Sequence, residues 1–293
     1  MAFWSAGPSR AKTPTAIEGL RARYNARFER MGPAPADISF TPDQMGPLHG
    51  EWARGAQSDP DRMILYFHGG GYVAGSPATH RALVGRLVEA SGIAAFSLRY
   101  RLGPECPFPA AVRDGVDAYR ALLSKGVCAH SIVLAGDEAG GGLAFAVALA
   151  IRNGGHAMPG AVAAMSPWAD LSLSGHSLLA SRKADNILGW ETLFLCARNY
   201  LCKSNPGDAY ASPAYASLRD FPPVMVHAGA NEVLRDDASK LGDRAAEAGV
   251  SVSVEIYDGM GHLFQAESGR SEARASLARL GQFVRARCKA MAA

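Results

Sequence analysis

The chain has 293 residues, of which 48% are hydrophobic, and its 30 basic and 27 acidic side chains give a formal net charge of +3. This length and composition favour a single folded domain spanning residues 1–293 with a large apolar core. Because no run of lysine or arginine forms a stripe for phosphate groups, nucleic acid is not an expected partner.

The N-terminal region and the length of the apolar runs indicate where in the cell the protein is expected. Residues 1–15 contain arginine and lysine but no sustained apolar stretch, so a secretory signal is not expected. The longest apolar run, Leu143 to Ile151, has nine residues, far below the roughly 20 that span a bilayer. We therefore expect a cytoplasmic protein that does not bind a membrane.

The five cysteines are scattered and include no Cys-x-x-Cys pair. An odd number of scattered cysteines argues against both a disulfide framework and a zinc site, and predicts reduced thiols. Neither a metal nor another cofactor is expected.

In chain order, short apolar runs alternate with helical patterns after a first helical pattern at residues 13–31. The runs predict strands at 63–67, 93–98, 131–135, 161–165, 224–227 and 252–256, with helices at 81–90, 110–125, 141–152, 236–248 and 271–289. Continuous apolar strands that alternate with helices indicate an α/β fold, with a mostly parallel central sheet and helices on both faces. In such sheets ligands bind at the carboxyl ends of the strands.

Two segments depart from this alternation and are expected to form a helical cap over that edge. The first, about residues 1–40, contains a helical pattern whose apolar residues share one face, namely Ile17, Leu20, Tyr24 and Phe28. The second, about residues 171–205, mixes turn residues with apolar ones that include Leu188 and Trp190. The alternative is that both are ordinary peripheral helices.

A glycine-rich loop, His68-Gly69-Gly70-Gly71-Tyr72, follows the predicted strand 63–67 directly. Consecutive glycines destabilise regular structure, so their use indicates backbone that turns tightly and presents its N–H groups to a ligand. A loop of this type forms one half of an oxyanion hole in some hydrolases. The alternative is a plain glycine-rich loop, but the flanking His68 and Tyr72 favour the functional interpretation.

A second unusual stretch, Gly136-Asp137-Glu138-Ala139-Gly140-Gly141, joins the strand 131–135 to a helix. Small residues two before and two after Glu138 allow its side chain to stand on a strained strand-to-helix turn. The helix that follows directs its N-terminal dipole and free N–H groups at that position, so the N–H of Ala139 is expected to be a second oxyanion donor. The alternative is a tight turn with two solvated acids.

Two further strand ends carry an acid and a histidine. Glu232 follows the strand 224–227, and His262 follows the strand 252–256. The order along the chain, with Glu138 first, then Glu232 and His262, matches the order of nucleophile, acid and base in α/β-hydrolases.

Together these motifs resemble the hormone-sensitive-lipase-like family of α/β-hydrolases, also called bacterial family IV carboxylesterases. The resemblance runs from about residue 63 to 289 and includes HGGGY, YRLGPECPFPAA from Tyr100, SPWADLSLSG from Ser166, FPPVMVHAGANEVLRDD from Phe221 and GMGHLFQ from Gly259. It implies an α/β-hydrolase fold that hydrolyses esters of small acyl compounds. Members often pair through the last strand and helix, so a homodimer through the region after Val252 is expected.

The resemblance also implies roles for individual residues. Gly69, Gly70 and Ala139 would donate to the oxyanion, Glu232 would orient His262, and His262 would act as the base. The main departure is Glu138, which stands where the family motif G-D-S-A-G has its nucleophilic serine. Loss of a triad member typically lowers the rate by about 10⁴-fold, so ordinary serine-esterase turnover is not expected.

Several interpretations of Glu138 stay open. It could be a carboxylate nucleophile, or a general base with lyase-like or dehydratase-like chemistry, acting with His262 and the oxyanion donors. Alternatively, the chain is a catalytically silent ligand-binding protein, as in the gibberellin receptors that resemble this family, or an esterase with an engineered Ser-to-Glu substitution. We favour an enzyme of the hydrolase family with altered chemistry.

The expected substrate is a small, fairly apolar acyl compound, because the predicted cap contains aromatic and aliphatic residues. The side chains expected to contact it are His68, Tyr72, Leu188 and Trp190.

Overall fold

A computed structural model of the chain describes residues 14–29, 32–185 and 187–288. Residues 1–13 of the expected cap, which also make up nearly all of the N-terminal region considered for a secretory signal, lie outside the described residues. The described chain forms one eight-stranded sheet with the strand order β1-β2-β4-β3-β5-β6-β7-β8. The strands are β1 (Ile38–Met45), β2 (Leu48–Gly55), β3 (Asp59–Phe67), β4 (Ile93–Leu98), β5 (Ile132–Asp137), β6 (Ala161–Met165), β7 (Val224–Gly229) and β8 (Val252–Tyr257). Strands β3 to β8 pair in parallel, which confirms the mostly parallel sheet.

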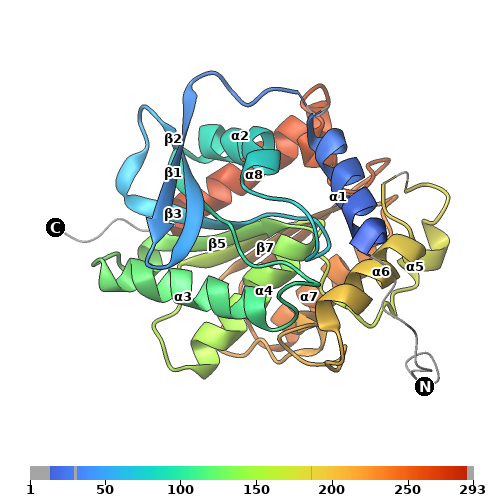
Figure 1. Cartoon of the computed structure of the whole chain (residues 1–293). Helices are drawn as coiled ribbons and strands as arrows, with labels where there is room; N and C mark the ends of the chain where they lie inside the picture. Colours follow the sequence, from blue (N-terminus) through green and yellow to red (C-terminus); the bar gives the residue numbers. More distant parts are fainter. Residues whose placement is uncertain (1–13, 30–31, 186, 289–293) are drawn as a thin grey trace.

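Helices cover both faces of this sheet (Figure 1). On one side lie α2 (Arg81–Ser91) and α8 (Ser271–Arg287), and on the other lie α3 (Ala110–Ser124), α4 (Ala139–Asn153) and α7 (Arg235–Glu247). The side chains of β3 alternate between the two layers, with Leu65 and Phe67 in one apolar core and Ile64 and Tyr66 in the other. This alternation follows from the two-residue period of a strand and explains why the strand reads as a continuous apolar run.

Three further helices lie close together at the carboxyl edge of the sheet (Figure 1). They are α1 (Pro14–Glu29), α5 (Ser177–Ala180) and α6 (Trp190–Leu201). On α1, Ile17, Leu20 and Phe28 are buried, as the helical pattern predicts. No helix of the described chain is both long and apolar enough to cross a membrane.

The antiparallel hairpin of β1 and β2 is missing from the sequence-based prediction. Strand β1 forms one edge of the sheet and leaves most of its residues exposed, so it lacks the apolar run that marks the other strands. It also contains Pro42, which is tolerated mainly in edge strands. An exposed edge strand gives only a weak periodic signal in the sequence. The hairpin is evident only in the structure, where β1 pairs with β2 and β2 pairs with β4.

Candidate active site

Glu138 stands on a sharp turn between β5 and α4, with φ 49° and ψ −118°. A Cβ on Gly140 would overlap the carbonyl oxygens of Phe67 and His68, and one on Gly136 would overlap the carbonyl of Gly140. The small residues around Glu138 are therefore needed because the start of α4 packs directly on the backbone of β3. The turn is held further by a 2.9 Å hydrogen bond from the Glu138 N–H to a carbonyl of β6.

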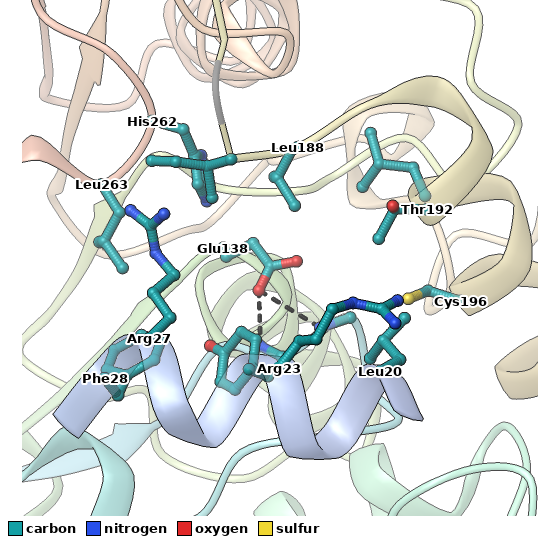
Figure 2. Close-up of a pocket in the computed structure, with 15 residues that line it drawn as sticks. Leu20, Arg23, Arg27, Phe28, Glu138, Leu188, Thr192, Cys196, His262 and Leu263 are labelled. Atoms are coloured by element: carbon teal, nitrogen blue, oxygen red, sulfur yellow. Dashed lines mark hydrogen bonds between the residues drawn. The ribbon is translucent and has the colours of Figure 1, made fainter. Parts of the chain in front are cut away.

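The carboxylate of Glu138 lies on the N–H groups of the glycine-rich loop. Its Oε2 atom accepts hydrogen bonds from the N–H of Gly70 at 2.5 Å and of Gly71 at 3.2 Å (Figure 2). Both glycines have positive φ values, 123° and 60°, a conformation that residues with a side chain rarely adopt. A Cβ on Gly71 would also lie 2.5 Å from Cys196 Sγ, so the loop can only approach α6 this closely without side chains.

The second oxygen of Glu138, Oε1, accepts no hydrogen bond from any residue that the structure describes. The side chain lines a cavity, although it is only 3% exposed. Burial raises the pKa of Glu138 to about 7, and the hydrogen bonds from Gly70 and Gly71 limit this rise. Near neutral pH the carboxyl group is therefore poised between its two protonation states.

The N–H of Gly69, expected to be an oxyanion donor, has a different partner in the structure. Its N–H donates to Asp137 Oδ1 at 3.1 Å and does not reach Glu138. Asp137 also accepts a hydrogen bond from Tyr66 at 2.6 Å and pairs with His80 at 3.2 Å. This buried network below the turn fixes the start of the glycine-rich loop, so that Gly71 takes the donor position expected for Gly69.

Ala139 is the first residue of α4 and is fully buried. Within the described residues its N–H donates no hydrogen bond. The first N–H groups of a helix have no partner inside the helix, so this donor is available to a ligand beside Glu138.

The structure brings Glu232 and His262 together at the ends of β7 and β8. The Nδ1 atom of His262 lies 3.8 Å from Oε2 of Glu232, which is beyond hydrogen-bond distance. No described residue gives a hydrogen-bond partner to His262 Nδ1 or to Glu232 Oε1. Burial lowers the pKa of His262 and raises the pKa of Glu232, so it favours the neutral form of both side chains.

Ser166 is a site residue that the sequence-based prediction left out. Its hydroxyl donates to Glu232 Oε2 at 2.6 Å and accepts a hydrogen bond from the Leu263 N–H at 3.1 Å. Ser166 thus links the acid to the loop that carries His262. The available signal was its place directly after β6, at the same sheet edge as the other site residues.

A cavity of about 220 Å³ opens over Glu138 and His262. Helices α1 and α6 supply most of its remaining wall, as Figure 2 shows for α1 below Glu138. The lining residues outside the sheet edge are mainly apolar, with two arginines, and are Leu20, Arg23, Tyr24, Arg27, Phe28, Ile187, Leu188, Thr192, Leu193 and Cys196.

Of the four expected substrate contacts, Leu188 lines this cavity and the other three lie elsewhere. His68 is buried under the loop, where its ring stacks on Tyr100 with 4.3 Å between centroids. Tyr72 is buried against Tyr200, with 4.0 Å between ring centroids. Trp190 begins α6 and is 38% exposed, stacked on a neighbouring ring of the same helix. The two loop residues support the loop from below because its tight glycine turn directs N–H groups, not side chains, at the ligand.

In the described part of the chain, no group of three or more His, Cys, Asp or Glu side chains is arranged to hold a metal ion. All five cysteines are free.

The parallel sheet, the strained turn after β5 and the acid and histidine after β7 and β8 define an α/β-hydrolase. A family model described as the alpha/beta hydrolase fold matches residues 64–266. An acetyl-hydrolase of Streptomyces hygroscopicus is 40% identical over 85% of this chain and 82% of its own length. An esterase of Acinetobacter venetianus is 33% identical over 87% of this chain and 84% of its own length.

The crystal structure of an esterase from the bacterial hormone-sensitive lipase family is similar to this chain with a TM-score of 0.91. The two are 37% identical, and the match covers 96% of this chain and 94% of the other. The chain belongs to the α/β-hydrolase fold family, in its hormone-sensitive-lipase-like branch.

Proposed function

We propose that this chain is an enzyme of the carboxylic ester hydrolase type that acts on a small acyl compound. In this proposal Glu138 occupies the position of the nucleophilic serine and acts as a general base. The relatives named acetyl-hydrolase and esterase support the reaction class. Helices α1 and α6, with the segment before α6, form the cap over the site, since both helices line the cavity.

The observation that carries the proposal is the position of the two carboxylate oxygens of Glu138. Oε2 is fixed by the N–H groups of Gly70 and Gly71, and the side chain lines the cavity where a ligand would bind. A pKa of about 7 lets the group both accept and return a proton near neutral pH. Anchoring one oxygen leaves the other oriented for proton transfer.

The reaction begins with a water molecule beside Glu138. Glu138 takes one proton from the water as the water oxygen attacks the acyl carbon, and the carbonyl oxygen becomes an oxyanion. Glu138 loses its charge in this step, so Gly70 and Gly71 bind it less strongly and can share their N–H groups with the new oxyanion, which the N–H of Ala139 also stabilises. Glu138 then returns the proton to the leaving alkoxide as the ester bond breaks.

The same geometry disfavours Glu138 as a nucleophile. A nucleophilic carboxylate stays close to the acyl carbon, and the substrate oxyanion would then need the N–H groups that Glu138 Oε2 holds. Proton transfer weakens the hydrogen bonds of Oε2 to those donors at the moment the oxyanion forms, whereas nucleophilic attack requires the carboxylate to leave them first.

A catalytically silent binding protein is the second candidate. The specific observation in its favour is that Glu138 already fills the donors that an oxyanion needs, like a bound product carboxylate. The long separation of 3.8 Å between His262 and Glu232 also fits a site that transfers no proton.

The test compares the chain as it stands with Glu138→Gln, Glu138→Ala and Glu138→Ser on short-chain nitrophenyl esters. We expect Glu138→Gln and Glu138→Ala to lose at least about 100-fold in kcat/KM, the usual contribution of a general base. Glu138→Ser should gain turnover, because serine would complete a triad with Glu232 and His262. If Glu138→Gln retains the full rate, Glu138 is not the base; if the unchanged chain has no activity, the binding protein is the correct alternative.

A further inference from the structure

Two arginines from α1 line the cavity on either side of Glu138. Arg27 extends toward His262 and Leu263, while Arg23 extends toward Cys196 (Figure 2). The two residues are four positions apart on the helix, so they share one face and lie about one turn, or roughly 6 Å, apart along its axis.

Within the part of the chain that the structure describes, neither arginine has an anionic partner at bonding distance. Among the described residues, no hydrogen bond or ion pair joins the guanidinium group of Arg23 or Arg27 to a carboxylate or a carbonyl. By contrast, Arg21 on the same helix forms an ion pair with Glu105, with 2.7 Å between a guanidinium nitrogen and the carboxylate oxygen Oε2. Arg27 is half-buried, and this burial lowers its pKa, with Asp185 and Glu267 acting on it from a distance.

The charges that line the cavity are therefore unbalanced. Glu138 supplies one negative charge when ionised, and its Oε2 atom is already bound by two N–H groups. Burial favours the neutral form of His262. The two arginines leave the charges that line the cavity net positive. Arg23 is exposed, but the half-buried guanidinium of Arg27 is partly desolvated, which is costly unless a ligand supplies an anionic partner.

We infer that the ligand of this site is a short acyl compound with a carboxylate at its far end, bound by Arg27 and Arg23. This inference rests on the proposed function for the identity of the reacting group, but the charge requirement is separate from catalysis. The planar guanidinium groups bind a carboxylate through paired hydrogen bonds. The apolar residues Leu20, Ile187 and Leu193 fit the methylene chain between the two ends.

A carboxylate fits better than a phosphate group. A phosphate monoester carries a charge of about −1.5 to −2 at pH 7, which would stand beside the Glu138 carboxylate. A single negative charge balances the cavity, whereas a double charge adds repulsion from Glu138.

The test measures equilibrium binding with two amides of equal chain length, succinamate and its uncharged analogue 4-oxopentanamide. Because amides resist ester hydrolases, calorimetry reports binding without turnover. We expect the unchanged chain to bind succinamate at least about 10-fold more tightly, given that a charge-assisted hydrogen bond contributes an affinity factor of about 10 to 100. Arg27→Gln and Arg23→Gln should each remove much of this preference, and Arg27→Lys should keep part of it.

The matched control is Arg244→Gln, which removes one exposed positive charge from α7, a helix that contributes no lining residue to the cavity, and should leave the preference unchanged. Equal affinity for the two amides, an undiminished preference in the Arg23→Gln/Arg27→Gln double variant, or tighter binding of inorganic phosphate than of succinamate would each overturn the inference. A preference for succinamate in a chain whose turnover is unaffected by Glu138→Gln would contradict the proposed function and leave this inference standing.

Discussion

Replacing Glu138 by glutamine should stabilise the fold, and the gain should depend on pH. The glutamine side chain has nearly the same shape and keeps an oxygen for the Gly70 and Gly71 donors, but it never ionises. The pKa of the carboxyl is about 7 in the folded chain and 4.5 as the reference value for glutamate. A difference of that size corresponds to about 3 kcal/mol of unfolding free energy.

The sign follows from the direction of the pKa change. Because the folded pKa of Glu138 is raised, its contribution to stability is fully present below pH 4.5 and is lost as the pH rises to about 7. The advantage of Glu138→Gln over the unchanged chain should therefore grow between these values and stay constant above them. Glu232 and Asp237 also have pKa values raised to about 8 by burial, but both proteins contain them and their effects cancel in the difference.

The assay is urea unfolding of both proteins at intervals from pH 5 to pH 9, followed by circular dichroism. Equal slopes against urea in the two proteins would show that only stability has changed. A stability difference that stays flat across this range, or that shrinks with rising pH, would refute the assignment of a buried and poorly solvated carboxyl to Glu138.

Two other substitutions test the supports of the site. Ser166→Ala removes the hydroxyl that donates to Glu232 and should lower the unfolding free energy by about 1 to 3 kcal/mol in urea titrations; no loss would show that this bond is not formed. Gly140→Ala should unfold the chain or cost at least about 3 kcal/mol, since its Cβ would overlap the Phe67 carbonyl, whereas Gly269→Ala, with open space around it, should leave the melting temperature nearly unchanged. A stable Gly140→Ala protein would contradict the close packing of α4 on β3.

Much of the fold could be predicted because its signals are local and repeated. Strands β4 to β7 and the second half of β3 are almost fully buried, so each forms a continuous apolar run. The helices between them bury one apolar face, which gives the helical period. The strand β1 escaped prediction because it is exposed at an edge and contains Pro42. Its place depends on pairing with β2, which no local pattern encodes.

The candidate site was predictable in position but not in detail. Glu138, Glu232 and His262 each follow a strand, and parallel strands bring such ends to one edge. Which glycine N–H points at Glu138 depends on φ values and on the anchoring of Gly69 by Asp137, and these arise only in three dimensions. The roles of His68 and Tyr72 were missed for the same reason, because their rings turn below the loop.

The dependence of kcat/KM on pH for the unchanged chain and for Glu138→Gln tests the central claim most directly. If Glu138 is the general base, the rate on a short-chain nitrophenyl ester should rise about tenfold per pH unit below the pKa of about 7 and level off above it. The Glu138→Gln protein should lose at least about 100-fold at pH 8 and show no inflection near pH 7. A Glu138→Gln protein with the rate and the pH profile of the unchanged chain would contradict the account.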